Sequence, residues 1–196
     1  MKYVLCLLLA LVVGGKSFAK GNGDLNLKNF PEGYVPKEIG AKLGRHFIPG
    51  KHFLHDGKWI HYAEVCTWLG ALRYAQVAGD DELIGMLEKR FEPLFTEEKV
   101  YLPIKNHVDL NMFGCLPLEF YRITKNQKYY DLGMPYADTQ WQLPADASDR
   151  EKKWAQKGFS WQTRLWIDDM FMITIVQSQA YRVTGNKEYI NRAAKE

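Results

Sequence analysis

Three long, almost uncharged segments are the feature that most restricts how this chain can fold. They span residues 59–78, 109–124 and 166–184, and the last carries no charge between Met170 and Tyr181. A helix that is apolar on most of its faces has to be buried on several sides. The segments that follow them, residues 80–94, 127–141 and the one that starts at Lys187, mix charged and apolar residues as outer helices do. The alternation predicts an inner and an outer layer of helices.

A short motif recurs at each passage from an apolar to a mixed segment. It occupies residues 75–83, 121–129 and 181–189. The second interval between copies is longer than the first, because it contains a charged loop, residues 144–159. In the first copy we expect Gly79 to end one helix and Asp80 or Asp81 to begin the next. Tetratricopeptide or ankyrin arrays have shorter and more constant periods of about 33–34 residues.

The copies of the motif are 46 and 60 residues apart. Hairpins of this length predict an all-α fold, an (α/α)6 barrel of the six-hairpin glycosidase type. We find no run that alternates as a strand does, and we expect about seven helices, roughly the first half of such a barrel. The last predicted helix reaches the final residue without a cap.

The N-terminus has the pattern of a signal peptide, residues 1–19. Lys2 precedes an apolar run of eleven residues, and Ser17, Phe18 and Ala19 resemble a cleavage site. The run is shorter than the ~20 residues that cross a bilayer, although an uncleaved membrane anchor is the alternative. Residues 20–34 are polar and predict an arm or linker, and residues 35–196 a partial catalytic domain. We therefore expect a periplasmic or extracellular protein without a membrane span after cleavage.

Charge and cysteine content exclude some classes of function. Cleavage would remove two lysines and lower the formal charge from +3 to +1, which gives no electrostatic basis for binding nucleic acid. Cys66 and Cys115 would then remain. They lie in apolar stretches and are either two buried free thiols, which we favour, or a disulfide. Neither has the spacing of a metal ligand.

Acidic residues open two of the apolar segments. Asp109 precedes Tyr121 by the same offset as Asp169 precedes Tyr181, and Asp168 lies one position further from that tyrosine. Equal offsets in successive hairpins predict that these carboxylates lie at one end of the barrel, on parallel inner helices. Aspartate at a helix start is also an ordinary cap. Adjacent helical residues point about 100° apart, so only one of Asp168 and Asp169 can face the axis.

The run Trp166-Ile-Asp-Asp-Met-Phe-Met172 resembles the catalytic segment of the unsaturated rhamnogalacturonyl and unsaturated glucuronyl hydrolases, glycoside hydrolase families 105 and 88. His107-Val-Asp-Leu-Asn-Met-Phe-Gly114 is similar to their other acidic segment, and residues 59–80 to their first inner helix. The resemblance covers residues 35–196. It implies a six-hairpin barrel without metal or cofactor, which hydrates the C4=C5 double bond that polysaccharide lyases leave on a uronic acid.

By this resemblance Asp168 protonates the double bond and activates water, and Asp109 orients the substrate or the water. The repeat offset favours Asp169 over Asp168, so that choice stays open. Other substrate-binding candidates are two tryptophans that suit stacking on a sugar ring, a histidine, and an arginine that suits a carboxylate: Trp59, Trp166, His61 and Arg164.

Lys157 and His107 are weaker candidates for the site. Members of the family tend to have a His-Lys pair before the catalytic segment, and here only Lys157 lies near it. The chain departs from the family pattern here, and Arg164 and Lys157 are the candidates for binding the substrate carboxylate.

The expected partner is a small oligosaccharide whose second sugar is rhamnose or an amino sugar. Another α/α-barrel hydrolase or epimerase, or a non-catalytic helical scaffold that binds glycan or protein, are the alternatives.

Overall fold

The structure is a computed structural model that describes residues 29–196. The predicted signal peptide and most of the predicted arm lie outside the described residues. The helices are α1 (Pro36–Phe47), α2 (Tyr62–Ala78), α3 (Asp81–Phe91), α4 (Val108–Asn111), α5 (Cys115–Thr124), α6 (Gln127–Thr139), α7 (Asp149–Gln156), α8 (Ile167–Thr184) and α9 (Lys187–Lys195). A two-stranded hairpin, β1 (Leu54–His55) and β2 (Trp59–Ile60), and three 3-10 turns, η1 (Glu92–Phe95), η2 (Lys99–Tyr101) and η3 (Met112–Gly114), complete the described elements.

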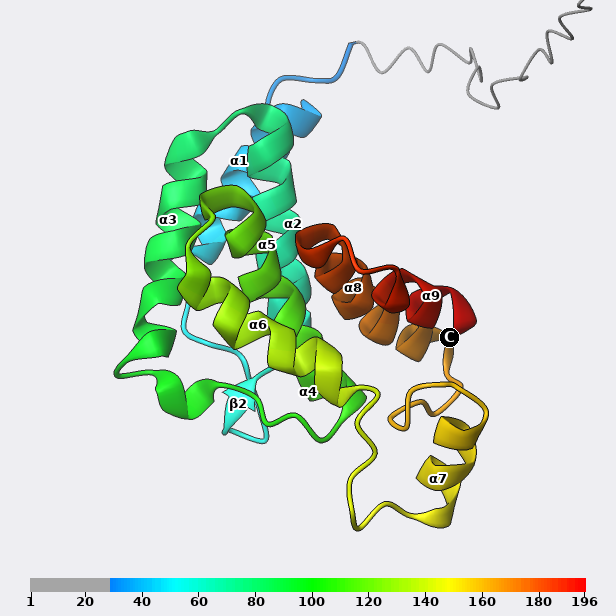
Figure 1. Ribbon diagram of the computed structural model, residues 1–196. Helices are drawn as coiled ribbons and strands as arrows, with labels where there is room; N and C mark the ends of the chain where they lie inside the picture. Colours follow the sequence, from blue (N-terminus) through cyan, green and yellow to red (C-terminus); the bar gives the residue numbers. More distant parts are fainter. Residues whose placement is uncertain (1–28) are drawn as a thin grey trace, which may run out of the picture.

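Three helical hairpins, α2–α3, α5–α6 and α8–α9, lie in sequence order, as the repeat predicts (Figure 1). Each turns at one residue in the left-handed conformation, namely Gly79, Lys125 and Gly185. The residue after it, Asp80, Asn126 or Asn186, accepts a backbone N–H of the next helix. A left-handed C-terminal residue followed by an Asx cap satisfies both helix ends. The all-α, α/α-barrel class is confirmed.

The inner helices α2, α5 and α8 are joined by a buried carboxylate. Glu119 of α5 accepts hydrogen bonds from Gln76 of α2, Gln179 of α8 and Arg122. Its side chain is only 1% exposed, and although burial alone would raise its pKa, these donors hold the pKa below its usual range. Gln76 and Gln179 lie toward the C-terminal ends of α2 and α8, so this shared acceptor brings these two ends together beside α5.

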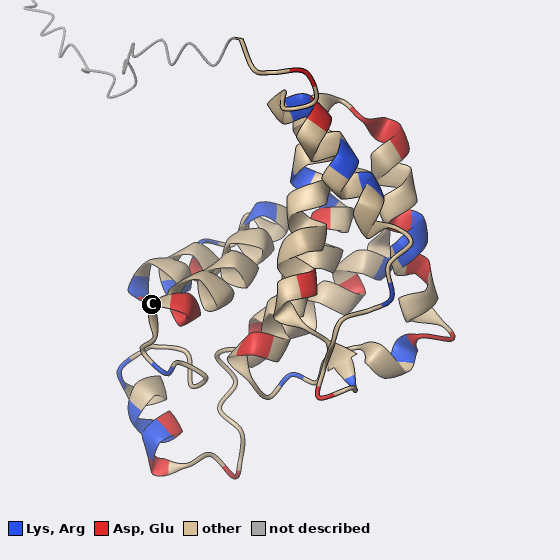
Figure 2. Ribbon diagram, turned by 180° about the vertical axis from the view of Figure 1, so that it is seen from behind, with Lys and Arg blue, Asp and Glu red and all other residues tan. Residues whose placement is uncertain are grey.

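Aromatic rings fill the space between the inner and outer layers. Phe91 of α3 lies at the centre of this cluster, and its ring centroid is 5.0–5.8 Å from those of five other aromatic residues. These are Trp68, Phe95, Phe113, Phe120 and Tyr129. Charged residues of both signs lie along α1, α3 and α7, as on solvated helix faces (Figure 2).

The structure corrects the predicted secondary structure in several places. The expectation of no strands is wrong, because β1 pairs with β2 through a tight turn in which Asp56 and Gly57 have positive φ. An Asp-Gly pair is a strong signal for such a turn, so this hairpin was present in the sequence. The first inner helix therefore begins at Tyr62 and not at Trp59. The charged loop 144–159 contains a helix, α7, which Ser148 starts through a capping box with Glu151.

The two cysteines do not form a disulfide in the structure. Cys115 is buried as predicted, and burial raises the pKa of its thiol. Cys66 is exposed, so the expectation of two buried thiols is wrong for this residue. The apolar residues around it in the sequence belong to faces of α2 other than its own. Within residues 29–196, no helix combines the length and apolar content that crossing a bilayer requires.

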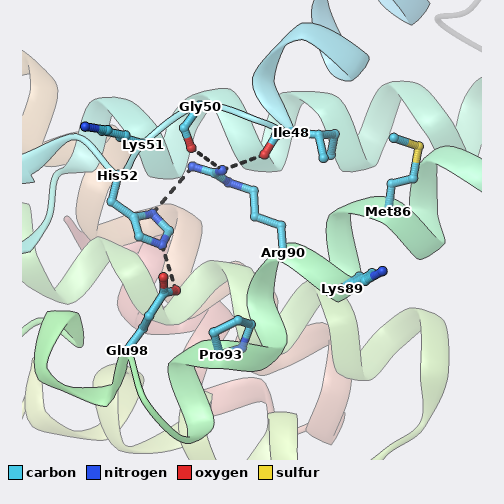
Figure 3. Close-up of a pocket in the computed structure, with 9 residues that line it drawn as sticks. All are labelled: Ile48, Gly50, Lys51, His52, Met86, Lys89, Arg90, Pro93 and Glu98. Carbon is cyan, nitrogen blue, oxygen red and sulfur yellow. Dashed lines mark hydrogen bonds and ion pairs between the residues drawn. The ribbon is translucent and has the colours of Figure 1, made fainter.

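A buried network of charged residues attaches the segment between α1 and β1 to the core (Figure 3). Arg90 of α3 donates to the carbonyls of Ile48 and Gly50 and to Glu64 Oε1. His52 lies between Glu64, at 2.7 Å, and Glu98, at 3.1 Å. The neighbouring cavity, about 490 Å³, is larger than the one beside the aspartates described below. The contacts of His52 and Arg90 are made to the protein itself, so we assign these groups a structural role.

This network should make stability depend on pH. The hydrogen bond that the His52 ring donates to Glu64 raises the pKa of His52 above its ordinary value of 6.5, although burial and the Arg90 charge oppose this. A raised pKa in the folded state stabilises the protein below pH 6.5, and this contribution is lost as the pH rises through the folded-state pKa. We expect the thermal midpoint to fall between about pH 6 and pH 8, measured by circular dichroism.

His52→Gln is the control for this prediction, because glutamine retains hydrogen-bonding groups but does not titrate. The variant should be less stable at pH 6 and should lack the decline. An equal decline in both proteins would contradict the assignment to His52.

Candidate active site

The N-terminal ends of the inner helices form one rim. His61 caps α2 by accepting the N–H of Ala63. His107 caps α4, which η3 connects directly to α5, by accepting the N–H of Asp109. Trp166 directly precedes α8. Because Glu119 joins the opposite ends of α2 and α8 beside α5, polar side chains at this rim are presented at one end of the helical layer.

One guanidinium joins the three aspartates. Arg164 Nη2 lies 2.6 Å from Asp169 Oδ1, 3.0 Å from Asp109 Oδ1 and 3.4 Å from Asp168 Oδ2. Its Nε is also 2.9 Å from Asp169 Oδ1. Asp109 and Asp168 come from successive hairpins, so the predicted convergence of these two carboxylates at one end is present.

The adjacent aspartates Asp168 and Asp169 have different environments. The Asp169 side chain is 1% exposed, and its second oxygen accepts the backbone N–H groups of Arg164 and Trp166. The Asp168 side chain is 44% exposed, and its contact with Arg164 is the longest in the cluster. Asp169 is therefore part of the framework that starts α8, whereas Asp168 is open to a ligand.

The backbone between Arg164 and Trp166 is strained. Leu165 has φ 60°, in the left-handed region of backbone conformation that residues other than glycine and asparagine rarely adopt. Leu165 is itself exposed, so packing of its side chain does not account for this conformation. The turn brings the Arg164 guanidinium over the Trp166 ring, 4.3 Å from its centroid. Trp166 remains 59% exposed.

Two histidines flank the carboxylates. His107 Nδ1 is 3.7 Å from Asp109 Oδ2. Burial, together with the charge of His55, lowers the pKa of His61, while Asp109 acts in the opposite direction. Lowering of this pKa favours a neutral imidazole at the rim, which both donates and accepts hydrogen bonds.

A cavity of about 220 Å³ adjoins the cluster. Arg164 and His107 line it together with Ser148, Arg150 and Glu151 of the α7 segment, and Arg164 is its link to the three aspartates, which do not themselves line it. In the neighbouring wall Gln162 is 7% exposed, and its amide atoms have no partner within residues 29–196. The charged loop before α8 therefore supplies one wall of the site.

The family model described as Glycosyl Hydrolase Family 88 matches residues 44–196, more than three quarters of the chain. The chain belongs to glycosyl hydrolase family 88. It is therefore a member of a glycoside hydrolase family, for which an oligosaccharide is the expected kind of substrate. No curated protein and no solved structure matches it.

The structure brings some of the predicted site residues of this family 88 chain together. Asp109, Asp168, Arg164 and Trp166 form one cluster, and His61 is close enough for the charge of Asp109 to affect its pKa. Trp59 lies in β2, and its ring is contacted by Lys58. Lys157 is exposed and lies over the Trp154 ring.

Two features of the site were not found from the sequence. The Arg164 guanidinium binds aspartates, whereas the sequence predicted a ligand for the substrate carboxylate. The strain at Leu165 has no signal, because leucine has no preference for the left-handed region. The described residues contain no cluster of His, Cys, Asp and Glu suited to a metal ion.

The strain at Leu165 can be tested by changing the residue. Leu165→Gly removes the Cβ conflict of about 1 kcal/mol and should leave the free energy of unfolding unchanged or raise it slightly. Leu165→Val, with a branched Cβ, should lower it by about 1–2 kcal/mol. Thermal unfolding of both variants measures the difference, and a valine variant as stable as the glycine variant would contradict a strained turn.

Proposed function

We propose that this protein releases an unsaturated uronic acid from oligosaccharides produced by polysaccharide lyases, through hydration of the C4=C5 double bond. The observation that carries the proposal is the convergence of Asp109 and Asp168 on one guanidinium at an exposed rim of a family 88 fold. General acid–base chemistry requires such a pair within reach of one small ligand.

Asp168 is the residue to which we assign proton transfer. It is accessible, whereas Asp169 is enclosed by its hydrogen bonds. Asp168 donates a proton to the double bond and takes one from the attacking water. The hemiketal that results opens and expels the neighbouring sugar. Asp109, on the opposite side of Arg164 Nη2, orients the water or the substrate.

The spacing of the two contacting oxygens does not match the spacing that inverting hydrolysis requires. Asp109 Oδ1 and Asp168 Oδ2 lie 3.0 and 3.4 Å from the same nitrogen, Arg164 Nη2. The separation of the two oxygens therefore cannot exceed the sum of these two distances. Inverting glycosidases hold their two carboxyl groups roughly 6.5–9.5 Å apart to admit water on the far side of the sugar. The two oxygens here are closer together than that range.

Three further residues fit a sugar at this rim. One face of the exposed Trp166 ring is covered by Arg164, and we assign the other face to stacking on the sugar ring. His61 is placed to hydrogen-bond a hydroxyl group, and Trp59 belongs to the hairpin that precedes it. We also propose that the enzyme is exported, because residues 1–19 have the pattern of a signal peptide.

The test is an assay of the full-length protein with unsaturated uronyl disaccharides that carry rhamnose or an amino sugar. We expect the ultraviolet absorbance of the conjugated double bond to decrease while the second sugar is released, detected by chromatography. The saturated disaccharides are the controls and should remain intact. Cleavage of saturated and unsaturated substrates at equal rates would show direct glycoside hydrolysis and contradict the proposal.

A further inference from the structure

Several independent contacts fix the position of Arg164. Asp169 accepts hydrogen bonds from its Nε and Nη2, and also from its backbone N–H at 2.6 Å. The Trp166 ring packs on the guanidinium, and the left-handed Leu165 sets the turn between the two. Although burial alone would lower the pKa of Arg164, the hydrogen bond to Asp169 and the charges of all three aspartates raise it. The arginine therefore stays charged and fixed in orientation.

The contact distances indicate that Asp169 fixes Arg164, and that Arg164 in turn fixes Asp109 and Asp168. Its contacts with Asp169 measure 2.6 and 2.9 Å, while those with Asp109 and Asp168 measure 3.0 and 3.4 Å. Asp169 is buried, whereas the other two are more exposed, at 15% and 44%. The pair Arg164–Asp169 is the rigid part, and Asp109 and Asp168 are attached to it.

We propose that Arg164 is a positioning residue, which holds Asp109 and Asp168 at a fixed spacing and screens their mutual repulsion. This inference rests on the proposed function for its effect on catalysis. One cation here faces three carboxyl groups, so the cluster offers little attraction for a further anion. Binding of the uronate carboxylate, which the sequence assigned to Arg164, then belongs to other residues.

The kinetic test compares Arg164→Gln and Arg164→Lys with the full-length protein. In Arg164→Gln we expect kcat to fall roughly 10²-fold or more with KM changed by less than about 3-fold, because the loss is in the transition state. The pH–rate profile should shift, because loss of the cation changes the electrostatic environment of both carboxyl groups. Lysine should restore part of kcat and part of the shift.

The matched control is Arg182→Gln, at the exposed C-terminal end of α8, the helix that follows Arg164. It should leave kcat, KM and the pH profile unchanged. A loss confined to KM in Arg164→Gln, with an unchanged profile, would identify a substrate ligand and overturn the inference.

A second measurement does not depend on activity. Crystal structures of the wild type, of Arg164→Lys and of Arg164→Gln report the positions of the Asp109 and Asp168 side chains. We expect the two carboxyl groups to lie further apart in the glutamine variant than in the wild type, and at an intermediate spacing in the lysine variant. Identical positions of both side chains in the wild type and the variants would overturn the positioning role. If the wild type leaves unsaturated disaccharides intact, the proposed function fails, and this comparison of structures still decides the role of Arg164.

Discussion

Asp168→Asn should reduce kcat on unsaturated uronyl disaccharides by about 10³-fold or more while the protein remains folded. Asparagine has nearly the same shape but cannot transfer a proton, and general acid–base groups contribute about 10²–10⁴-fold each. The side chain is 44% exposed and only 3.4 Å from Arg164, so its substitution removes little from the folded state. Absorbance assays at saturating substrate, with circular dichroism on the same samples, measure both quantities.

Asp169→Asn is the matched control, because the two residues are adjacent and carry the same group. Asp169 is buried and accepts hydrogen bonds from Arg164 and from two backbone N–H groups. Weakening a buried ion pair of this kind costs up to about 3–5 kcal/mol. Asp169→Asn should therefore lower the thermal midpoint far more than Asp168→Asn does. A variant at Asp168 that keeps full activity would show that the catalytic assignment is wrong.

Phe91→Ala should be the most destabilising single substitution in the aromatic cluster. The residue is fully buried, and its ring meets five others between α2, α3, α5 and α6. Truncation of a buried phenylalanine costs about 3–5 kcal/mol, since it leaves a cavity that surrounding rings cannot close. In a domain of this size that loss lowers the thermal midpoint by roughly 6–20 °C.

Val100→Ala is the control for this substitution. Val100 lies in η2 and is 72% exposed, so the change should stay within about 0.5 kcal/mol. Differential scanning calorimetry of the two variants provides the comparison. A thermal midpoint for Phe91→Ala within a few degrees of that of the wild type would mean that packing of the aromatic cluster contributes little to the stability of the fold.

The helical hairpins and their turns were predictable because their causes are local. At Gly79 and Gly185 a residue that tolerates the left-handed region, followed by Asp or Asn, ends one helix and starts the next, whereas at Lys125 only the asparagine that follows is such a signal. The distribution of apolar residues indicates which helix is buried. Asp109 and Asp169 were found for the same reason, since equal offsets in a repeat place residues at equal heights, whereas Asp168 was assigned from the resemblance of its segment to the catalytic segment of the family. The Asp-Gly turn of the β1–β2 hairpin was also local, and it was overlooked because two-residue strands show no alternation.

The sequence by itself determined the layered helices, the caps and the family-like acidic segments, all of which depend on residues within a few turns of one another. Only the tertiary structure decided that Asp168 is open while Asp169 is enclosed, that Arg164 binds aspartates, and that Leu165 is strained. Arg164 reaches Asp109 across 55 residues of chain, and Glu119 reaches Gln179 across 60. Contacts of this range arise when hairpins pack, because packing selects which of several polar partners a buried charge meets.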